Sequence, residues 1–311
     1  MSETISLEKK LSTFTYGIVG LGIMGGSIAK AIRNSVGQSN FFSGKILGLD
    51  RNTESLEAAK KEQIIDEGFL PDQNKIMLSQ CDFVFVCLYP HAILDFLKEN
   101  RNNFKDNAII TDISGVKNLL EINYDEICPP NADFIMGHPM AGGEKEGFAS
   151  SKGEFFINHN YILIDKPNNI ASKIHQENVE TFKTLIHKMG FSKITVTDSN
   201  THDNKIGFTS QLCHVLASCL VDSAENSDVT QFGGGSFEDL TRIAMINAPL
   251  WTELFLANKN ELLSHIESFE NSLTTLKNFI KNDDAQGCQS YLENVRTKRL
   301  EMSRIDVKNE N

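Results

Sequence analysis

The sequence predicts an α/β protein, in which a doubly wound and mostly parallel sheet is followed by an all-α part. Up to Asp198, apolar segments of strand length alternate with amphipathic segments of helical length, which is the pattern of a sheet covered by helices on both faces. After Asp198 only helical spacing of the apolar residues continues. We therefore expect two domains, at residues 1–198 and 199–311, because a chain of 311 residues is long enough for two cores.

Seven segments are predicted as strands, in chain order FTYGIV (14–19), KILGLDRN (45–52), CDFVFVCLYP (81–90), NAIITDISG (107–115), DFIMGHP (133–139), NYILIDKP (160–167) and KITVTD (193–198). The third is apolar almost throughout, as a strand buried on both faces should be. Helices are predicted between most of these strands, including one at 52–63 with Thr53 as its N-cap. Beyond a glycine-rich break at 231–237, we expect a series of long amphipathic helices.

The composition and the net charge of the chain disfavour several classes of protein. The chain is acidic, with a formal net charge of −11 and a pI of about 5.2, which disfavours binding to nucleic acid. Its longest apolar runs are too short to span a bilayer, and its polar N-terminus lacks the apolar core of a signal peptide. The six cysteines form no CxxC pair and no zinc-like spacing with histidine. We therefore expect free thiols, no metal site, no membrane partner and a cytoplasmic location.

A glycine turn follows the first predicted strand. Its sequence, GLGIMG (20–25), precedes a predicted helix and a second strand, which is the context that a dinucleotide-binding turn requires. Gly20 permits the tight turn, Gly22 leaves room for a pyrophosphate, and Gly25 lets helix and strand approach closely. The helix N-terminus then offers free N–H groups to the phosphates. The sequence thus predicts a Rossmann-type site, to which the neighbouring residues Leu21, Ile23 and Met24 also belong.

The end of the second predicted strand bears on the choice of cofactor. Asp50 lies there, and its carboxylate can accept hydrogen bonds from both ribose hydroxyls while repelling a 2′-phosphate. This favours NAD over NADP. Arg51 follows directly, and its guanidinium could pair with a phosphate or stack on the adenine, so NADP remains the alternative.

The segment GHPMAGGEKEGF (137–148) is the other unusual stretch of the chain. Its four glycines and one proline are too many for a regular helix or strand, so we expect a constrained loop. Pro139 would hold His138 rigidly in that loop. A neutral imidazole near its ordinary pKa suits a general base, although a lone histidine is more often structural.

This segment resembles the HPxAGxExxG signature of the prephenate and arogenate dehydrogenases, the NAD(P)-dependent enzymes of tyrosine synthesis. Three further segments resemble the same family in the same order, namely TDISGVK (111–117), THDNKIGFTSQLCH (201–214) and GGGSFEDLTRIA (233–244). The resemblance extends from about residue 16 to residue 260. It implies that the chain oxidises prephenate with NAD⁺, with loss of CO₂, to give 4-hydroxyphenylpyruvate.

The resemblance also implies roles for particular residues. His138 would accept the proton of the C4 hydroxyl, and Arg242 would hold a substrate carboxylate with its planar guanidinium. His214 is expected to bind or orient the substrate. Glu144 would tune His138, contact the substrate or gate the site, and Ser114 is a further candidate for substrate contact. For Arg242 a surface salt bridge, and for Glu144 a solvated loop charge, are the plainer alternatives.

The chain departs from the family pattern at two places. Gln211 and Cys213 stand where the family commonly has histidine and proline. Ser114 and Gly115 are in the reverse of the common order, so the family serine would fall at Gly115, and Ser114 points elsewhere unless the turn is rearranged.

Further charged residues lie near these motifs. His202 is expected to cap its helix or to organise the cleft with Asp203, and Lys117 to close the turn near the cofactor. Lys205 is loosely placed for the catalytic lysine of a β-hydroxyacid dehydrogenase, which is one alternative function. An arogenate dehydrogenase and a non-catalytic NAD sensor are the others.

The helical part is rich in Leu, Ile and Phe, and its long helices would not bury all their apolar faces alone. We therefore expect a homodimer formed through this part, and a compact monomeric bundle is the alternative. If the dimer forms as in the family, the partner subunit could lend residues to the site.

Overall fold

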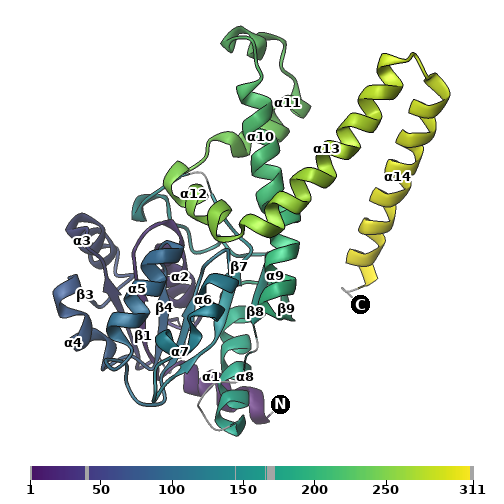
Figure 1. Ribbon diagram of the computed structural model, residues 1–311. Coiled ribbons are helices and arrows are strands. Elements are labelled where there is room, and N and C mark those ends of the chain that lie inside the picture. Colours follow the sequence, from purple (N-terminus) through teal and green to yellow (C-terminus); the bar gives the residue numbers. More distant parts are fainter. Residues whose placement is uncertain (1, 39–41, 144, 165, 167–171, 309–311) are drawn as a thin grey trace. The chain divides into compact units, whose positions relative to one another are not determined.

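The computed structural model describes residues 2–38, 42–143, 145–164, 166 and 172–308. The chain divides into two compact units, residues 1–258 and 259–311 (Figure 1). The predicted boundary at residue 198 stays a prediction, because the larger unit also contains the first helices that follow Asp198.

A six-stranded parallel sheet forms the centre of the larger unit, with strand order β3-β2-β1-β4-β5-β6. The strands are β1 (Thr15–Val19), β2 (Lys45–Leu49), β3 (Glu67–Phe69), β4 (Phe83–Val86), β5 (Ile109–Asp112) and β6 (Asp133–Phe134). Val19 pairs with Leu49 on one side and with Val86 on the other. The chain therefore reverses its direction of winding between β1 and β4, and in such sheets ligands bind beyond the C-terminal ends of the strands at this point.

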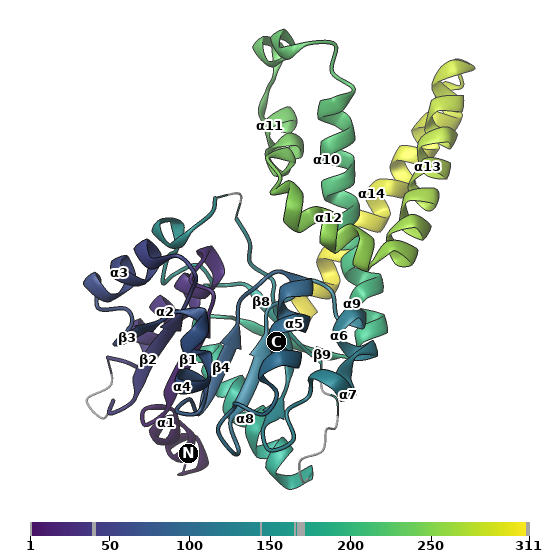
Figure 2. The same cartoon turned by 60° about the vertical axis from the view of Figure 1, so that its left-hand side comes forward.

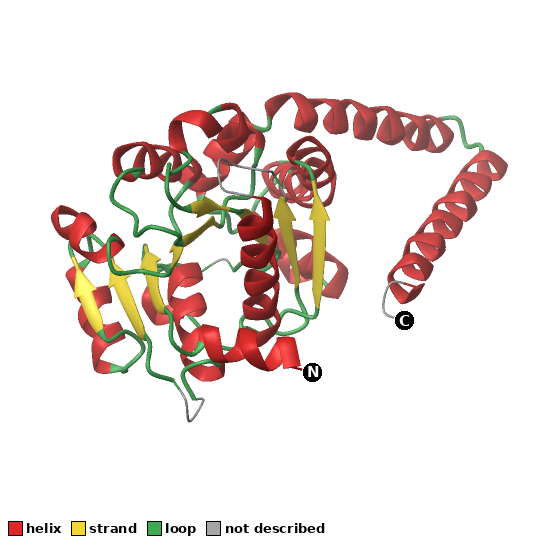
Figure 3. Ribbon diagram, turned by 90° about the horizontal axis from the view of Figure 1, so that it is seen from below, coloured by secondary structure: helices red, strands yellow, loops and turns green. Residues whose placement is uncertain are grey.

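Helices cover both faces of this sheet, as Figure 3 shows. The first face is covered by α1 (Ser2–Leu11), α2 (Ile23–Ser35), α3 (Thr53–Lys61) and α8 (Ser172–Lys188), and the second by α4 (Asn74–Leu78), α5 (Pro90–Asn100), α6 (Asn118–Ile122) and α7 (Tyr124–Ile127). Alternate residues of β4 enter the two cores, with Phe83 and Phe85 in the first and Val84 and Val86 in the second. The prediction of a doubly wound sheet is confirmed.

A second, three-stranded sheet contains β7 (Met136–Pro139), β8 (Asn160–Ile164) and β9 (Lys193–Thr197). Strand β7 is antiparallel to β8, and β8 is parallel to β9. The single strand predicted at 133–139 is thus divided at Ile135 between the two sheets. The prediction that residues 137–148 contain no regular structure is wrong for His138, which pairs with Ile162 inside β7.

The rest of the larger unit is helical. It contains α9 (Ser199–Ile206), the π-helical segment η3 (Gly207–Gln211), α10 (Leu212–Asp222), the 3₁₀ segment η4 (Ser227–Phe232), α11 (Gly235–Thr241), the 3₁₀ segment η5 (Arg242–Ala244) and α12 (Ala248–Ala257). Helices α10 and α11 lie side by side (Figure 2). Between residue 198 and residue 308, the described chain contains no strand, as predicted.

Side-chain caps begin several helices. Asp198 caps α9 by accepting the N–H of Thr201 at 2.9 Å, which excludes the capping role considered for His202. The predicted cap of α3 is wrong by one residue, because Asn52 accepts the N–H groups of Glu54 and Ser55.

The smaller unit is a pair of long helices, α13 (Lys259–Lys281) and α14 (Ala285–Lys308), which contact each other. The turn between them brings the rings of Phe279 and Tyr291 to 6.2 Å. Several apolar side chains of this unit are exposed in the single chain, including Ile280 at 65% and Leu292 at 51%. An amphipathic helix pair with uncovered apolar residues is what a self-association surface requires.

Candidate active site

A cavity of about 590 Å³ lies beyond the C-terminal ends of β1, β4 and β5, entirely within the larger unit. Its walls come from the glycine turn, from the loop after β5, from β7 and from the helical segments α9 to α12. The sequence-predicted residues Gly22, Ile23, Met24, Ser114, His138, His214 and Arg242 all line it. Gly20, Leu21, Gly25, Asp50 and Arg51 do not, and Glu144 lies outside the described residues.

The glycine turn has the geometry that its sequence predicts. Gly20 has φ +87°, and a Cβ there would lie 2.5 Å from the carbonyl oxygen of Cys87. A Cβ on Gly25 would lie 1.9 Å from the carbonyl oxygen of Gly20, so helix and turn are in direct contact. At Gly22 no atom lies within 4 Å of the Cβ position. The space above Gly22 is open, and it lies at the N-terminus of α2, whose first turn contains no acidic residue.

Asp50 holds this turn from the end of β2. Its Oδ2 accepts the N–H of Leu21 at 2.6 Å, and its Oδ1 accepts the N–H of Asn52 at 2.8 Å. Each carboxylate oxygen can accept more than one hydrogen bond, so both retain capacity for ribose hydroxyls. Arg51 beside it is exposed. The turn, the helix terminus and Asp50 together fit a bound dinucleotide.

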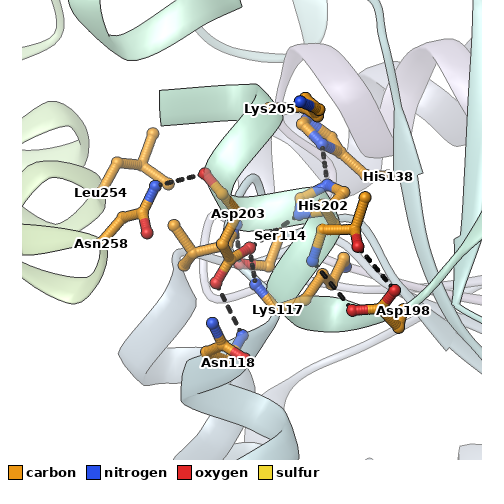
Figure 4. Close-up of polar contacts among 12 residues, drawn as sticks. Ser114, Lys117, Asn118, His138, Asp198, His202, Asp203, Lys205, Leu254 and Asn258 are labelled. Carbon is orange, nitrogen blue, oxygen red and sulfur yellow. Dashed lines mark hydrogen bonds and ion pairs between the residues drawn. The ribbon is translucent and has the colours of Figure 1, made fainter. Parts of the chain in front are cut away.

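His138 also lines the cavity and is half-buried. Its Nδ1 lies 2.9 Å from Nε2 of His202, and Nδ1 of His202 lies 2.7 Å from Oδ1 of Asp203 (Figure 4). His202 is 1% exposed and Asp203 is fully buried. The two histidines and the carboxylate therefore form one chain of hydrogen bonds that ends at the cavity.

Asp203 is fixed by further contacts. Its Oδ1 and Oδ2 accept the N–H groups of Lys117 and Asn118, both at 2.8 Å, at the start of α6. Asn258 donates its side-chain N–H to the carbonyl oxygen of Asp203 at 2.8 Å. The sequence suggested that His202 either caps its helix or organises the cleft together with Asp203. The contacts of Asp203 and His202 match the second role.

A buried ion pair supports the strand that carries His138. The Lys117 ammonium lies 2.5 Å from Oδ2 of Asp112, and it donates to the carbonyl oxygen of Gly137. Oδ1 of Asp112 accepts the N–H of Gly137 at 3.2 Å. Both peptide groups of Gly137 are thus held from β5, which fixes the position of the next residue, His138. Burial lowers the pKa of Lys117, and Asp112 opposes that shift.

The surroundings of the two histidines favour their neutral forms. Burial lowers the pKa of His138 well below its usual value, and the electrostatic influence of the neighbouring His202 and Lys117 lowers it further. Burial also lowers the pKa of His202, which the hydrogen bond to Asp203 partly opposes. At neutral pH both rings are therefore uncharged, and each has one nitrogen able to accept a proton or hydrogen bond.

The helical wall of the cavity presents aromatic and cationic groups. His214 donates from Nδ1 to the carbonyl oxygen of Ser210 at 2.9 Å, and its ring stacks on Trp251 with centroids 3.5 Å apart. Arg242 lines the same wall and is exposed. Trp251 was not among the predicted site residues, although it is the single tryptophan of the chain.

The two departures from the family pattern have different structural consequences. The Ser114 hydroxyl accepts the N–H of Val116 at 3.2 Å, so it belongs to the turn itself. A Cβ on Gly115 would instead lie 3.7 Å from Nε2 of His138, so this position faces the imidazole. Gln211 is 1% exposed and bridges two elements, donating to the carbonyl oxygen of Leu254 and accepting from the side chain of Asn258.

The π-helical segment η3 was not predicted from the sequence, which shows continuous helical spacing there. Its residues Thr209, Ser210 and Gln211 all line the cavity, as does His214 in the next helix. Interruptions of this kind inside α-helices are frequent at functional sites. Lys205, the residue on which the β-hydroxyacid dehydrogenase alternative depends, is exposed and is not part of the cavity lining.

No group of three or more His, Cys, Asp and Glu side chains in the described part of the chain is arranged to hold a metal ion. None of the helices formed by the described residues combines the length and the apolar character needed to cross a membrane.

Comparisons with known proteins agree with this geometry. The model of the prephenate dehydrogenase nucleotide-binding domain matches residues 28–206, and that of the prephenate dehydrogenase dimerization domain matches residues 198–294. The prephenate dehydrogenase of Lactococcus lactis is 31% identical over 287 residues, which are 89% of this chain and 74% of that protein. The prephenate dehydrogenase of Bacillus subtilis is 27% identical over 288 residues, with 91% and 74% covered.

Among solved structures, prephenate dehydrogenase from A. aeolicus in complex with hydroxyphenyl propionate and NAD⁺ superposes with a TM-score of 0.79 and 32% identity. The match covers 93% of this chain and 98% of that one. An open glycine turn, a hydrogen-bonded histidine pair and a helical wall with an arginine thus occur in a chain that matches both domain models of prephenate dehydrogenase. The chain belongs to the prephenate dehydrogenase family.

Proposed function

We propose that the chain is a prephenate dehydrogenase, which converts prephenate and NAD⁺ into 4-hydroxyphenylpyruvate, CO₂ and NADH. The observation that carries the proposal is one cavity that is lined both by a neutral, positioned imidazole and by an open dinucleotide turn. The names of the relatives with about 30% identity support it.

The cofactor is NAD⁺, held by the glycine turn, the N-terminus of α2 and Asp50. The open space at Gly22 would receive the pyrophosphate, and the remaining lone pairs of Asp50 would accept hydrogen bonds from the ribose hydroxyls. When bound, the nicotinamide supplies the acceptor for the hydride that leaves C4 of the substrate.

His138 handles the proton of the C4 hydroxyl. As hydride leaves the carbon, the hydroxyl proton passes to the neutral imidazole, and a carbonyl forms at C4. The ring then loses its carboxylate as CO₂, and the electron pair of the broken bond makes the ring aromatic. The resulting phenolate oxygen takes the proton back from His138, so the protein ends the cycle unchanged.

The helical wall holds the substrate. The Arg242 guanidinium binds a carboxylate through paired hydrogen bonds, and His214, fixed by Ser210 and stacked on Trp251, orients the other end of the molecule. Ser114 contributes to the shape of the turn, because its hydroxyl oxygen is engaged by Val116. These roles make the cavity complementary to a small dianion.

The chain acts as a homodimer formed through its helical part. The match to a dimerization domain at residues 198–294 and the exposed apolar residues of α13 and α14 support this. A cytoplasmic location stays a prediction from the sequence.

The test is an assay of NADH or NADPH formation, with each of the two cofactors and with prephenate or arogenate as substrate. Turnover with prephenate and NAD⁺ is the expected result. Turnover only with arogenate would replace the substrate and keep the mechanism, whereas no turnover with any of the four pairs would refute the proposed activity. The His138→Asn variant, which cannot take up the proton, should lose about 10²–10⁴ in kcat and retain NADH binding.

A further inference from the structure

We propose that His202 and Asp203 are positioning residues, which hold the His138 imidazole in the tautomer whose Nε2 accepts the substrate proton. The inference rests on the proposed dehydrogenase function, but part of its test is independent of turnover. It assigns a role to a buried pair that does not line the cavity.

The donor and acceptor roles along the chain follow from its fixed end. An ionised carboxylate only accepts, so Nδ1 of His202 must carry the hydrogen that is donated to Asp203 across 2.7 Å. A neutral imidazole has one N–H, so Nε2 of His202 is an acceptor. The 2.9 Å contact therefore requires that Nδ1 of His138 carries the hydrogen, which leaves Nε2 of His138 with a free lone pair.

That lone pair is on the cavity side of the ring. His138 lines the cavity, while its Nδ1 edge is turned to the buried His202. Nε2 and Cε1 are the atoms of His138 nearest to the position of a Cβ on Gly115, both at 3.7 Å. Without His202 nothing would prevent the opposite tautomer, in which Nε2 carries a hydrogen and cannot act as a base.

The charges around the pair also fit a temporary imidazolium. The groups that face the two histidines are the carboxylates of Asp112 and Asp203 and the ammonium of Lys117, all fully buried. Lys117 is paired with Asp112, so the Asp203 carboxylate is left to compensate a positive charge on His138 through the intervening ring. Because the phenolate oxygen recovers the proton, the chain of hydrogen bonds needs to orient His138 and does not need to export a proton.

Asp203 is unsuited to a first test because it also accepts the N–H groups of Lys117 and Asn118. Its replacement would disturb the start of α6 as well as the histidine chain. Among the described residues, the side chain of His202 forms hydrogen bonds with His138 and Asp203, and two substitutions of similar size separate its functions. His202→Gln keeps an oxygen that can accept from Nδ1 of His138, whereas His202→Leu removes the acceptor.

The first measurement is the ¹⁵N NMR spectrum of histidine-labelled full-length protein, at a pH where buried imidazoles are neutral. The His138 signals are assigned by their loss in His138→Asn. We expect the hydrogen of the His138 ring to be on Nδ1 in the wild type and on Nε2 in His202→Leu. A wild-type His138 with its hydrogen on Nε2 would overturn the inference, whether or not the protein turns over prephenate.

The second measurement compares steady-state kinetics. In a serine protease, the loss of the group that fixes the histidine tautomer lowers kcat by about 10⁴. We expect kcat of His202→Leu to be lower than that of the wild type by about 10² or more, while KM for both substrates stays within about threefold. The kcat of His202→Gln should be at least about tenfold higher than that of His202→Leu.

A variant that is merely misfolded would be recognised by its thermal denaturation and by loss of NADH binding. Equal kcat in His202→Leu and wild type would refute the positioning role while leaving the proposed function intact. An equal loss in His202→Leu and His202→Gln, with NADH binding kept in both, would refute it too, because the acceptor would then not matter. An inactive wild type would refute the proposed function alone, since the NMR result stands without turnover.

Discussion

Gly22 and Gly25 belong to the same turn but are constrained by different parts of the molecule. A methyl group on Gly25 would meet the backbone oxygen of Gly20 at 1.9 Å, whereas one on Gly22 would meet nothing within 4 Å. We expect Gly25→Ala to lower the free energy of unfolding by at least about 2 kcal/mol. Gly22→Ala should change it by less than about 0.5 kcal/mol and weaken NADH binding about tenfold or more.

Urea denaturation and NADH fluorescence titration measure these two effects separately. Each variant serves as the control for the other, because both add the same methyl group to the same turn. If Gly22→Ala bound NADH as tightly as the wild type, the pyrophosphate would not pass over Gly22.

The pH dependence of activity follows from the state of His138. The base must be neutral to take up a proton, and its pKa lies well below the usual 6.5 because of burial and of the electrostatic influence of His202 and Lys117. A lowered pKa keeps the ring neutral to lower pH, so kcat/KM should not fall until the pH is below 6.5. The pH profile of kcat/KM checks this, and an acidic limb centred at or above 6.5 would contradict it.

At the scale of elements, the ion pair of Lys117 and Asp112 joins β5 to β7 and thereby sets the position of His138. Removing one member leaves the other charge buried without its partner, which typically costs about 3–5 kcal/mol. We therefore expect Lys117→Met to destabilise the fold by that amount in urea denaturation. The double variant Lys117→Met/Asp112→Asn should be more stable than Lys117→Met. Equal stability of the two would mean that the lost contact to Gly137, and not the unpaired charge, causes the effect.

Elements were predicted from the sequence where a local pattern determines them. The strands, the glycine turn and the long helices each have a periodicity that is visible within about ten residues. No local pattern indicates that residues 133–139 are divided between two sheets. The division depends on the partner strands, because the residues before Ile135 pair with β5 and those after it pair with β8. The π-helical segment η3 likewise depends on packing, since GFTSQ has no distinct helical signal.

At the scale of the whole molecule, we expect a dimer with twice the chain mass of 34.7 kDa. Ile280 in α13 is 65% exposed, and a charge there should oppose burial of an apolar face. Ile280→Glu should therefore shift the mass measured by light scattering toward the monomer at low concentration. The matched control is Ile122→Glu in α6, where the wild-type residue is 83% exposed and lies outside the matched dimerization domain. A monomeric wild type would refute the dimer.

The fold class can be predicted from the amino-acid sequence alone, and so can seven of the residues that line the cavity. Local periodicity determines strands and helices, and the spacing of Gly20, Gly22 and Gly25 determines a turn that few other residue types could form. His138 was selected because the motif around it resembles one family. These features depend on residues that are contiguous in the sequence, so they can be predicted without knowledge of the packing.

Only the tertiary structure decided what surrounds those residues. The hydrogen bonds of His138 to His202 and of Asp203 to Lys117 join residues 64 and 86 positions apart. The position of Gly115 beside the His138 imidazole likewise joins two segments that are distant in the sequence. Burial and hydrogen-bond partners arise from distant segments, and they determine the tautomer and the pKa of a base, which residue type alone leaves open.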